Sequence, residues 1–265
     1  MCSDTRISYS GFSSDSGFKF DWAGKNMPAM IADNATRARE LLSFYRTHLN
    51  SVPEDLFTDN DLRIPPQQYK RHRIEEYLQL RWGVSFTEYS AGVLSHLPEQ
   101  EQFTILRDIA EMDLECQLII VTTHGEMPRL FTVDSRGYVA DSGCLAVIGS
   151  GSWLAHSTLA QRLYYPHLRL ENALYEIYEA KKVSEREPSV GPGTQLVVIY
   201  PKTMSIRSVS AGKGQNVLQD MYWQYGPQIL PMELVLPEDT IDPLESIKQP
   251  NATEDDFGSP EDGGS

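Results

Sequence analysis

The sequence contains few cysteines and no long apolar run. Its three cysteines, Cys2, Cys116 and Cys144, lie far apart among 265 residues. This odd and scattered set fits neither a disulfide framework nor a zinc site built from paired cysteines. No stretch is apolar over the thickness of a bilayer, and no charged segment followed by an apolar one opens the chain. We therefore expect reduced thiols in a cytoplasmic protein that does not enter a membrane.

Basic residues are also scarce. The chain has 23 lysines and arginines against 37 aspartates and glutamates, which gives a formal net charge of −14. Nucleic acid is therefore not an expected partner, because its binding depends on a surplus of positive charge. The one basic cluster, at residues 70–73, is interpreted as a solvated helix face.

The acidic charge is concentrated at the C-terminal end. Residues 237–265 combine many aspartates and glutamates with Lys248 as the single basic residue, several prolines and glycines, and few large apolar side chains. Such a segment cannot bury enough apolar surface to offset the entropy lost on ordering. We predict that residues 1–236 form one folded domain and that residues 237–265 form a disordered acidic tail.

Apolar side chains recur with helical or strand periodicity through the predicted domain. The patterns predict helices over residues 35–50, 67–82, 99–112, 152–164, 170–184 and 214–223, and strands over 117–122, 129–133, 137–140, 144–148 and 194–200. Asn34 is the predicted N-cap of the first helix. The strands occur in runs rather than alternating singly with helices. We therefore expect an α+β fold with two antiparallel sheets between helical layers rather than one parallel sheet.

The most informative segment is residues 146–155, where an apolar predicted strand runs into Gly149-Ser-Gly-Ser152 and then into a helix. Considered alone, this turn only starts the helix, with Ser150 or Ser152 as N-cap. It is not a phosphate-binding Walker loop, because no Gly-Lys-Ser/Thr follows. His124-Gly-Glu126 likewise lacks the spacing of a metalloprotease motif. The segment therefore leaves two interpretations open, a helix start or a catalytic turn.

Other motifs place this turn in a larger pattern. They are Cys2-Ser-Asp-Thr-Arg-Ile-Ser8, Phe18-Lys-Phe20, residues 27–46, Leu130-Phe-Thr-Val-Asp-Ser-Arg-Gly137, Ile148-Gly-Ser-Gly-Ser152, Leu170-Glu-Asn-Ala-Leu174 and Leu196-Val-Val-Ile199. Their order resembles that of a proteasome β-type subunit, an N-terminal nucleophile (Ntn) hydrolase. The similarity covers most of residues 2–200, apart from a polar and helical insertion near 51–90. It implies a four-layer αββα sandwich.

The resemblance also implies a set of catalytic roles. Enzymes of this family use an N-terminal threonine, serine or cysteine as nucleophile, and its own α-amino group accepts the proton because its ordinary pKa is about 8. By resemblance, Lys19 lowers the pKa of the nucleophile, Asp4 orients that lysine, and Ser150 helps to relay the proton. Backbone N–H groups of the turn at 149–151 would stabilise the oxyanion. This chemistry requires no cofactor and no metal.

The sequence departs from the family pattern at two places. In the family, a hairpin of about 12–16 residues separates the nucleophile from the Asp-x-Arg motif, whereas three residues precede Asp4 here. Three alternatives remain open: the chain is truncated at its N-terminus, the hairpin has been lost, or removal of Met1 makes Cys2 the nucleophile. After the helix at 170–184, Pro188 and Pro192 remove backbone donors where the family has a serine–glycine motif.

Two classes of function follow from these observations. The first is a proteasome-like peptidase or amidase subunit whose nucleophile lies upstream of this chain's start, with peptides or proteins as substrates. The second is a non-catalytic subunit that keeps the sandwich for assembly or binding. Whether the chain is an enzyme is therefore left undecided by the sequence. In both classes the resemblance implies self-association, and a ring is the usual arrangement in the family.

Overall fold

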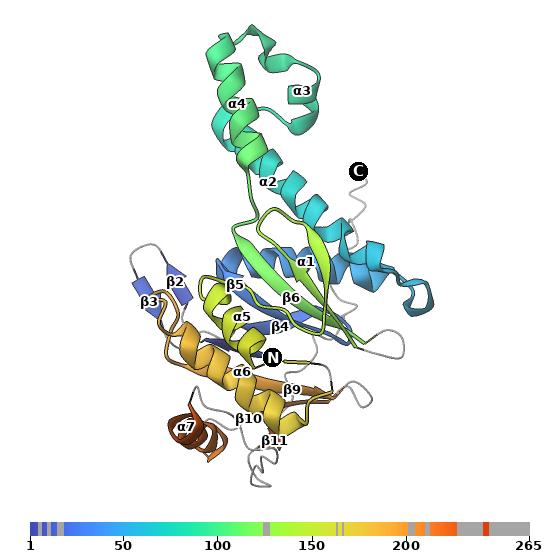
Figure 1. Ribbon diagram of the computed structural model, residues 1–265. Helices are drawn as coiled ribbons and strands as arrows, with labels where there is room; N and C mark the ends of the chain where they lie inside the picture. Colours follow the sequence, from blue (N-terminus) through green and yellow to red (C-terminus); the bar gives the residue numbers. More distant parts are fainter. Residues whose placement is uncertain are drawn as a thin grey trace, which may run out of the picture.

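The computed structural model describes residues 1–4, 7–9, 12–14, 19–123, 128–162, 164–165, 167–200, 205–209, 213–226 and 241–243. Residues 3–4, 7–9, 12–14 and 241–243 are described by their backbone alone. The described part is a mixed α+β structure in which the strands pair antiparallel, as predicted (Figure 1). Among these residues, no helix combines the length and the apolar composition that crossing a bilayer requires.

The larger sheet has five strands in the order β4-β5-β6-β7-β8. Helix α1 (Ala35–Ser51) covers one face, where Leu41, Leu42 and Tyr45 are fully buried against the sheet. The helix begins as predicted, because the Asn34 Oδ1 accepts hydrogen bonds from the Thr36 and Arg37 N–H groups at 3.1 and 3.2 Å. The strands are β4 (Phe20–Gly24), β5 (Met27–Asp33), β6 (Cys116–Thr122), β7 (Arg129–Val133) and β8 (Val139–Gly143).

The smaller sheet has four strands in the order β1-β9-β10-β11. One face packs on α6 (Leu170–Ser184) and α7 (Lys213–Tyr225), in a core that contains Leu174, Leu196 and Leu218. The strands are β1 (Cys2–Asp4), β9 (Thr194–Tyr200), β10 (Ser205–Val209) and β11 (Ile241–Pro243). A separate two-stranded pair is formed by β2 (Ile7–Tyr9) and β3 (Phe12–Ser14).

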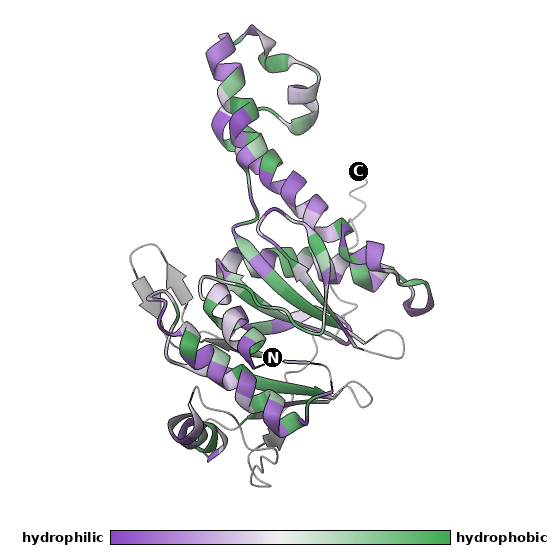
Figure 2. Cartoon of the chain, viewed as in Figure 1, coloured by the Kyte–Doolittle hydropathy of each residue, from purple (hydrophilic) through white to green (hydrophobic). Residues whose placement is uncertain are grey.

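A third apolar core joins the two sheets. Met30 and Ile119 of the larger sheet and Val197 of the smaller sheet are buried together. Their neighbours in sequence, such as Ile31 and Leu196, belong to the helix-facing cores. Successive residues of a strand point to opposite faces, so each sheet buries one face against helices and part of the other against the second sheet. Figure 2 shows the resulting hydrophobic colour along the central strands.

The segment between α1 and β6 forms a helical arm that projects beyond the sheets (Figure 1). It contains α2 (Ile64–Trp82), α3 (Phe86–Ser90), α4 (Glu99–Glu111) and three 3₁₀ helices, η1 (Glu54–Leu56), η2 (Asp59–Leu62) and η3 (Val93–His96). A small core of its own includes Leu78, Leu94 and Ile105. The helical segment therefore continues beyond the predicted limit of 90 as far as Glu111.

Two other predictions need correction. Residues 144–148 are not a strand, because β8 ends at Gly143, whose positive φ of 62° turns the chain out of the sheet. The Asp141 carboxylate stabilises this turn by accepting a hydrogen bond from the Gly143 N–H at 2.9 Å. In the predicted disordered tail, residues 241–243 form β11, since their backbone pairs with β10. The rest of the tail lies outside the described residues.

Candidate functional site

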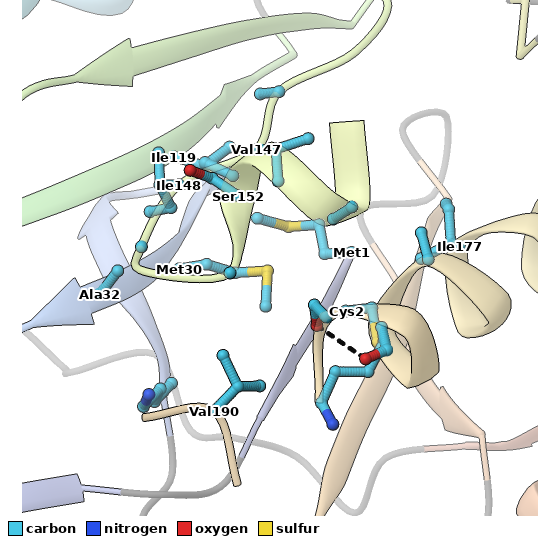
Figure 3. Close-up of a pocket in the computed structure, with 18 of the residues that line it drawn as sticks. Met1, Cys2, Met30, Ala32, Ile119, Val147, Ile148, Ser152, Ile177 and Val190 are labelled. Atoms are coloured by element: carbon cyan, nitrogen blue, oxygen red, sulfur yellow. Dashed lines mark hydrogen bonds between the residues drawn. The ribbon is translucent and has the colours of Figure 1, made fainter. Parts of the chain in front are cut away.

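A cavity of about 500 Å³ lies beside the core between the two sheets. Figure 3 shows Met30 and Ile119 of the larger sheet on one side and Ile177 of α6 on the other, with Met1 between them. Helix α5 (Ser152–Gln161) contributes Leu159 to the wall. The size and the apolar walls are typical of pockets that hold a small molecule or a side chain of a larger ligand.

The segment at 144–148 lines this cavity instead of extending the sheet. Ile148 packs against the core between the sheets. The chain then turns at Gly149, which has a φ of 88° and accepts a hydrogen bond from the Ser152 N–H at 3.0 Å. The predicted N-cap role of Ser150 or Ser152 is wrong. Gly151 occupies the N-cap position without a side-chain cap, and Ser152 is already the first helical residue.

Gly151 has a steric role at the start of α5. A Cβ atom at this position would lie 2.9 Å from the Ser184 Cβ and 2.8 Å from the Val190 Cγ2. These distances are shorter than van der Waals contact, so only glycine allows α5 to approach the end of α6 this closely. The close approach fixes the position of the preceding residue, Ser150, which lines the cavity.

Replacing Gly151 with alanine should destabilise the protein by about 1–3 kcal/mol, because α5 and α6 must separate to accommodate the added methyl group. Urea unfolding measures the effect. Ser150→Ala is a matched control one residue away, because Ser150 is exposed and its substitution should change the free energy of unfolding by less than about 0.5 kcal/mol. Equal stability of the two variants would contradict the proposed contact.

Lys19 lies at the junction of the two sheets. Its backbone N–H donates to the Gln195 Oε1 of β9 at 3.0 Å, and its carbonyl accepts from the Ile31 N–H of β5 at 3.0 Å. Lys19 lines the same cavity as Ser150. The structure therefore brings two of the three predicted site residues, Lys19 and Ser150, to one cavity, although they are far apart in the sequence.

Asp4, the third predicted site residue, is described by its backbone only. It pairs with Thr194 in the β1–β9 ladder, and the preceding Ser3 pairs with Gln195. Because Gln195 also binds the Lys19 N–H, the Asp4 backbone lies near the start of β4. The position of the Asp4 carboxylate lies outside the described part of the chain.

Asp33 is a site residue that the sequence did not indicate. It follows the buried part of β5, has a left-handed φ of 64°, and lines the cavity near Lys19. Partial desolvation raises the pKa of the Asp33 carboxyl, while a hydrogen bond from the Gln117 side chain and the charge of Lys19 act in the opposite direction. The sequence does contain a signal for Asp33, because it is a polar residue at the end of an apolar strand. Only the folded structure, however, places Asp33 near Lys19.

Lys181 is a second basic group on the cavity wall that the sequence did not indicate. Its side chain is 5% exposed, and Nζ contacts the Glu185 Oε1 at 2.6 Å and the Gly191 carbonyl at 2.9 Å. The Lys181 ammonium is therefore paired with the carboxylate of Glu185, the residue that follows α6 and that also contacts the Lys182 Nζ at 2.7 Å. Ser184, one turn away from Lys181, donates to its carbonyl at 2.6 Å.

The arrangement can hold a ligand that has both apolar and polar groups. Apolar side chains form the walls, while Lys19, Asp33 and Ser150 contribute polar groups. No cluster of three or more metal-ligating side chains is present among the residues that the structure describes. Comparison of the chain with known protein families and with curated proteins gives no match.

Proposed function

We propose that the chain is a proteasome-like Ntn hydrolase subunit, a cytoplasmic peptidase or amidase, with the cavity as its substrate pocket. The observation that carries this proposal is the presence of Lys19 and Ser150, which are remote in the sequence, in one cavity beside the core between two antiparallel sheets. The substrate is a peptide or protein. An apolar side chain would occupy the walls, and the scissile carbonyl would lie near the turn at 149–151.

The packing of the sheets supports the finer proposal of a four-layer sandwich. The apolar cores follow one another in the order α1 and the larger sheet, the two sheets, and the smaller sheet with α6 and α7. This order corresponds to helix, sheet, sheet and helix. The helical arm is then an insertion in the sandwich, placed between α1 and β6.

In the proposed mechanism, the nucleophile is the first residue of a strand that pairs with β1. The strand β1 stands at one edge of the four-stranded sheet and contributes Cys2 to the cavity wall. The Lys19 ammonium would lower the pKa of the nucleophile, an effect that is larger in a cavity than in water. Ser150 would relay the proton between the α-amino group and the leaving amine, and Asp4 would orient Lys19.

The test is peptide hydrolysis by the chain expressed together with the coding sequence that precedes Met1. We expect cleavage of a fluorogenic peptide with a bulky apolar residue before the scissile bond, and a loss of about 10²–10⁴-fold in kcat for Lys19→Ala. Lys25→Ala is the matched control, because Lys25 is exposed in the β4–β5 turn and lies outside the cavity. Undiminished activity of the Lys19 variant would refute the proposed role of this lysine.

The second candidate is a non-catalytic subunit that binds peptides. This candidate is favoured because polar groups beside the cavity are already paired within the chain. After α6, Ser189 donates to Glu187 at 3.3 Å, and in α6 Lys181 is paired with Glu185. Binding of the same fluorogenic peptide without hydrolysis, by chains with and without the upstream sequence, would support this candidate. Hydrolysis that requires Lys19 would exclude it.

A further inference from the structure

Helix α4 of the arm has two apolar faces. Ile105 is buried in the arm's own core, and Ile109 packs against that core. Phe103 and Leu106 are not part of that core and are 65% and 57% exposed. Packing of the arm onto itself therefore does not account for this second face. Figure 1 shows that α4 lies far from the two sheets, so the sheets do not cover the face either.

Charged residues flank the exposed phenylalanine at equal distances. Glu99 precedes Phe103 by four residues and Arg107 follows it by four, so the three side chains form one row along α4. Glu99 and Arg107 are exposed, like Phe103. Arg107 also contacts Asp108 at 3.6 Å, but an exposed pair of this kind contributes little. The row therefore carries opposite charges on either side of an apolar centre.

We propose that this face of α4 binds the same face of a second copy of the chain, with the two helices antiparallel and a two-fold axis at Phe103. This symmetry places Phe103 against Phe103 of the second copy. It also places Glu99 opposite Arg107 of the second copy, and the symmetry repeats this pair. A parallel arrangement would instead bring like charges together. Charge complementarity therefore selects a second copy in the antiparallel orientation.

The contact is weak and reversible on its own. A single helix crossing buries less than the roughly 1,000 Å² that a stable interface needs. Two exposed apolar residues, Leu106 and Ala110, lie on the row of α4 next to Phe103 and would extend the contact between the two copies. The proposal concerns the arm and is independent of the hydrolase activity proposed for the cavity.

The experiment traps the two-fold contact with a disulfide. Phe103→Cys is introduced into a chain that carries Cys2→Ser and Cys144→Ser, while Cys116 stays because it is buried. On the axis, the two Cα atoms would approach within the 4.4–6.8 Å that a disulfide requires. We expect rapid formation of a covalent dimer under mild oxidation on a non-reducing gel. Val93→Cys and Leu56→Cys are matched controls at other exposed apolar positions of the segment between α1 and β6 and should cross-link slowly.

A charge reversal tests the orientation. Arg107→Glu in the Phe103→Cys chain should slow cross-linking by about fivefold or more, because it replaces two exposed ion pairs with two pairs of like charges. Adding Glu99→Arg should restore the rate. Circular dichroism verifies that each variant is folded. Cross-linking of Phe103→Cys no faster than that of the controls, or a rate unaffected by Arg107→Glu, would overturn the proposal.

Discussion

Replacing Arg162 with methionine is expected to lower the free energy of unfolding by about 3–5 kcal/mol, because it leaves buried carboxylates without their counter-charge. The Arg162 side chain is 13% exposed and that of Glu179 is 3% exposed. Arg162 donates from Nε to the Glu179 Oε2 at 2.7 Å and from Nη2 to the Glu179 Oε1 at 2.9 Å. Nη2 also donates to the Gly226 carbonyl at 2.6 Å, which connects α5 and α6 to the end of α7.

Urea unfolding at neutral pH measures the loss, and a double variant provides its control. Arg162→Met combined with Glu179→Gln removes both charges, so it should recover a large part of the stability lost in the single variant. The exposed pair of Arg169 and Glu171, 3.6 Å apart, provides a surface comparison. Arg169→Met should cost less than about 1 kcal/mol. Similar losses for Arg162→Met and Arg169→Met would contradict the buried role of the first pair.

Replacing Glu176 with glutamine should stabilise the protein above neutral pH by up to about 3 kcal/mol. Glu176 is 4% exposed, and its Oε2 has no hydrogen-bond partner within the described structure. Desolvation raises the pKa of the Glu176 carboxyl from 4.5 to about 7, although the charge of Arg162 opposes the shift. Among the residues that the structure describes, the other ionisable groups that act on Glu176 are Glu179 and Tyr164, and they do not neutralise a negative charge.

The sign of the pH dependence follows from the raised pKa. The folded protein holds the Glu176 proton more tightly than the unfolded chain does. The corresponding stabilisation is therefore complete below pH 4.5 and is lost as the pH rises through about 7. A shift of this size corresponds to about 3 kcal/mol at 1.36 kcal/mol per pH unit. Glutamine resembles the protonated acid and does not ionise, so the variant avoids this loss.

Unfolding curves at pH 5 and pH 8.5 check this prediction. Wild type and Glu176→Gln should differ little at pH 5, whereas the variant should be the more stable protein at pH 8.5. Glu101→Gln is the matched control, because Glu101 is exposed on α4 and should change stability by less than about 0.5 kcal/mol at either pH. A pH-independent difference between wild type and the Glu176 variant would contradict ionisation as the cause.

The helices that pack on a sheet were predictable to within a few residues. The spacing of Ala38, Leu41, Leu42 and Tyr45 predicted α1, and the structure confirms its start at the Asn34 cap. The helix over 170–184 was predicted with its observed limits. In both segments the local pattern and the tertiary packing agree, because an apolar stripe of each helix faces a sheet. The opposite side of α1 faces solvent, whereas α6 is also buried against other helices.

Short apolar segments were not predictable in the same way. Residues 144–148 have the composition of a strand, yet the turn at Gly143 takes them to the cavity wall. Periodicity cannot distinguish a buried strand from an extended segment that lines a pocket. The helix predicted at 99–112 was correct in position, but its pattern did not reveal that it belongs to the arm and packs against α2 and η3 rather than against a sheet.

The sequence by itself determined the class of structure, most helices, the antiparallel pairing of the strands and the acidic net charge. These properties depend on the spacing between neighbouring residues and on composition. The sequence also singled out Lys19 and Ser150. Only the tertiary structure placed those two residues in one cavity, added Asp33 and Lys181 to its wall, and buried Glu176 beside Arg162, which Glu179 already binds. Such placements depend on contacts between distant segments, and local patterns carry no information about them.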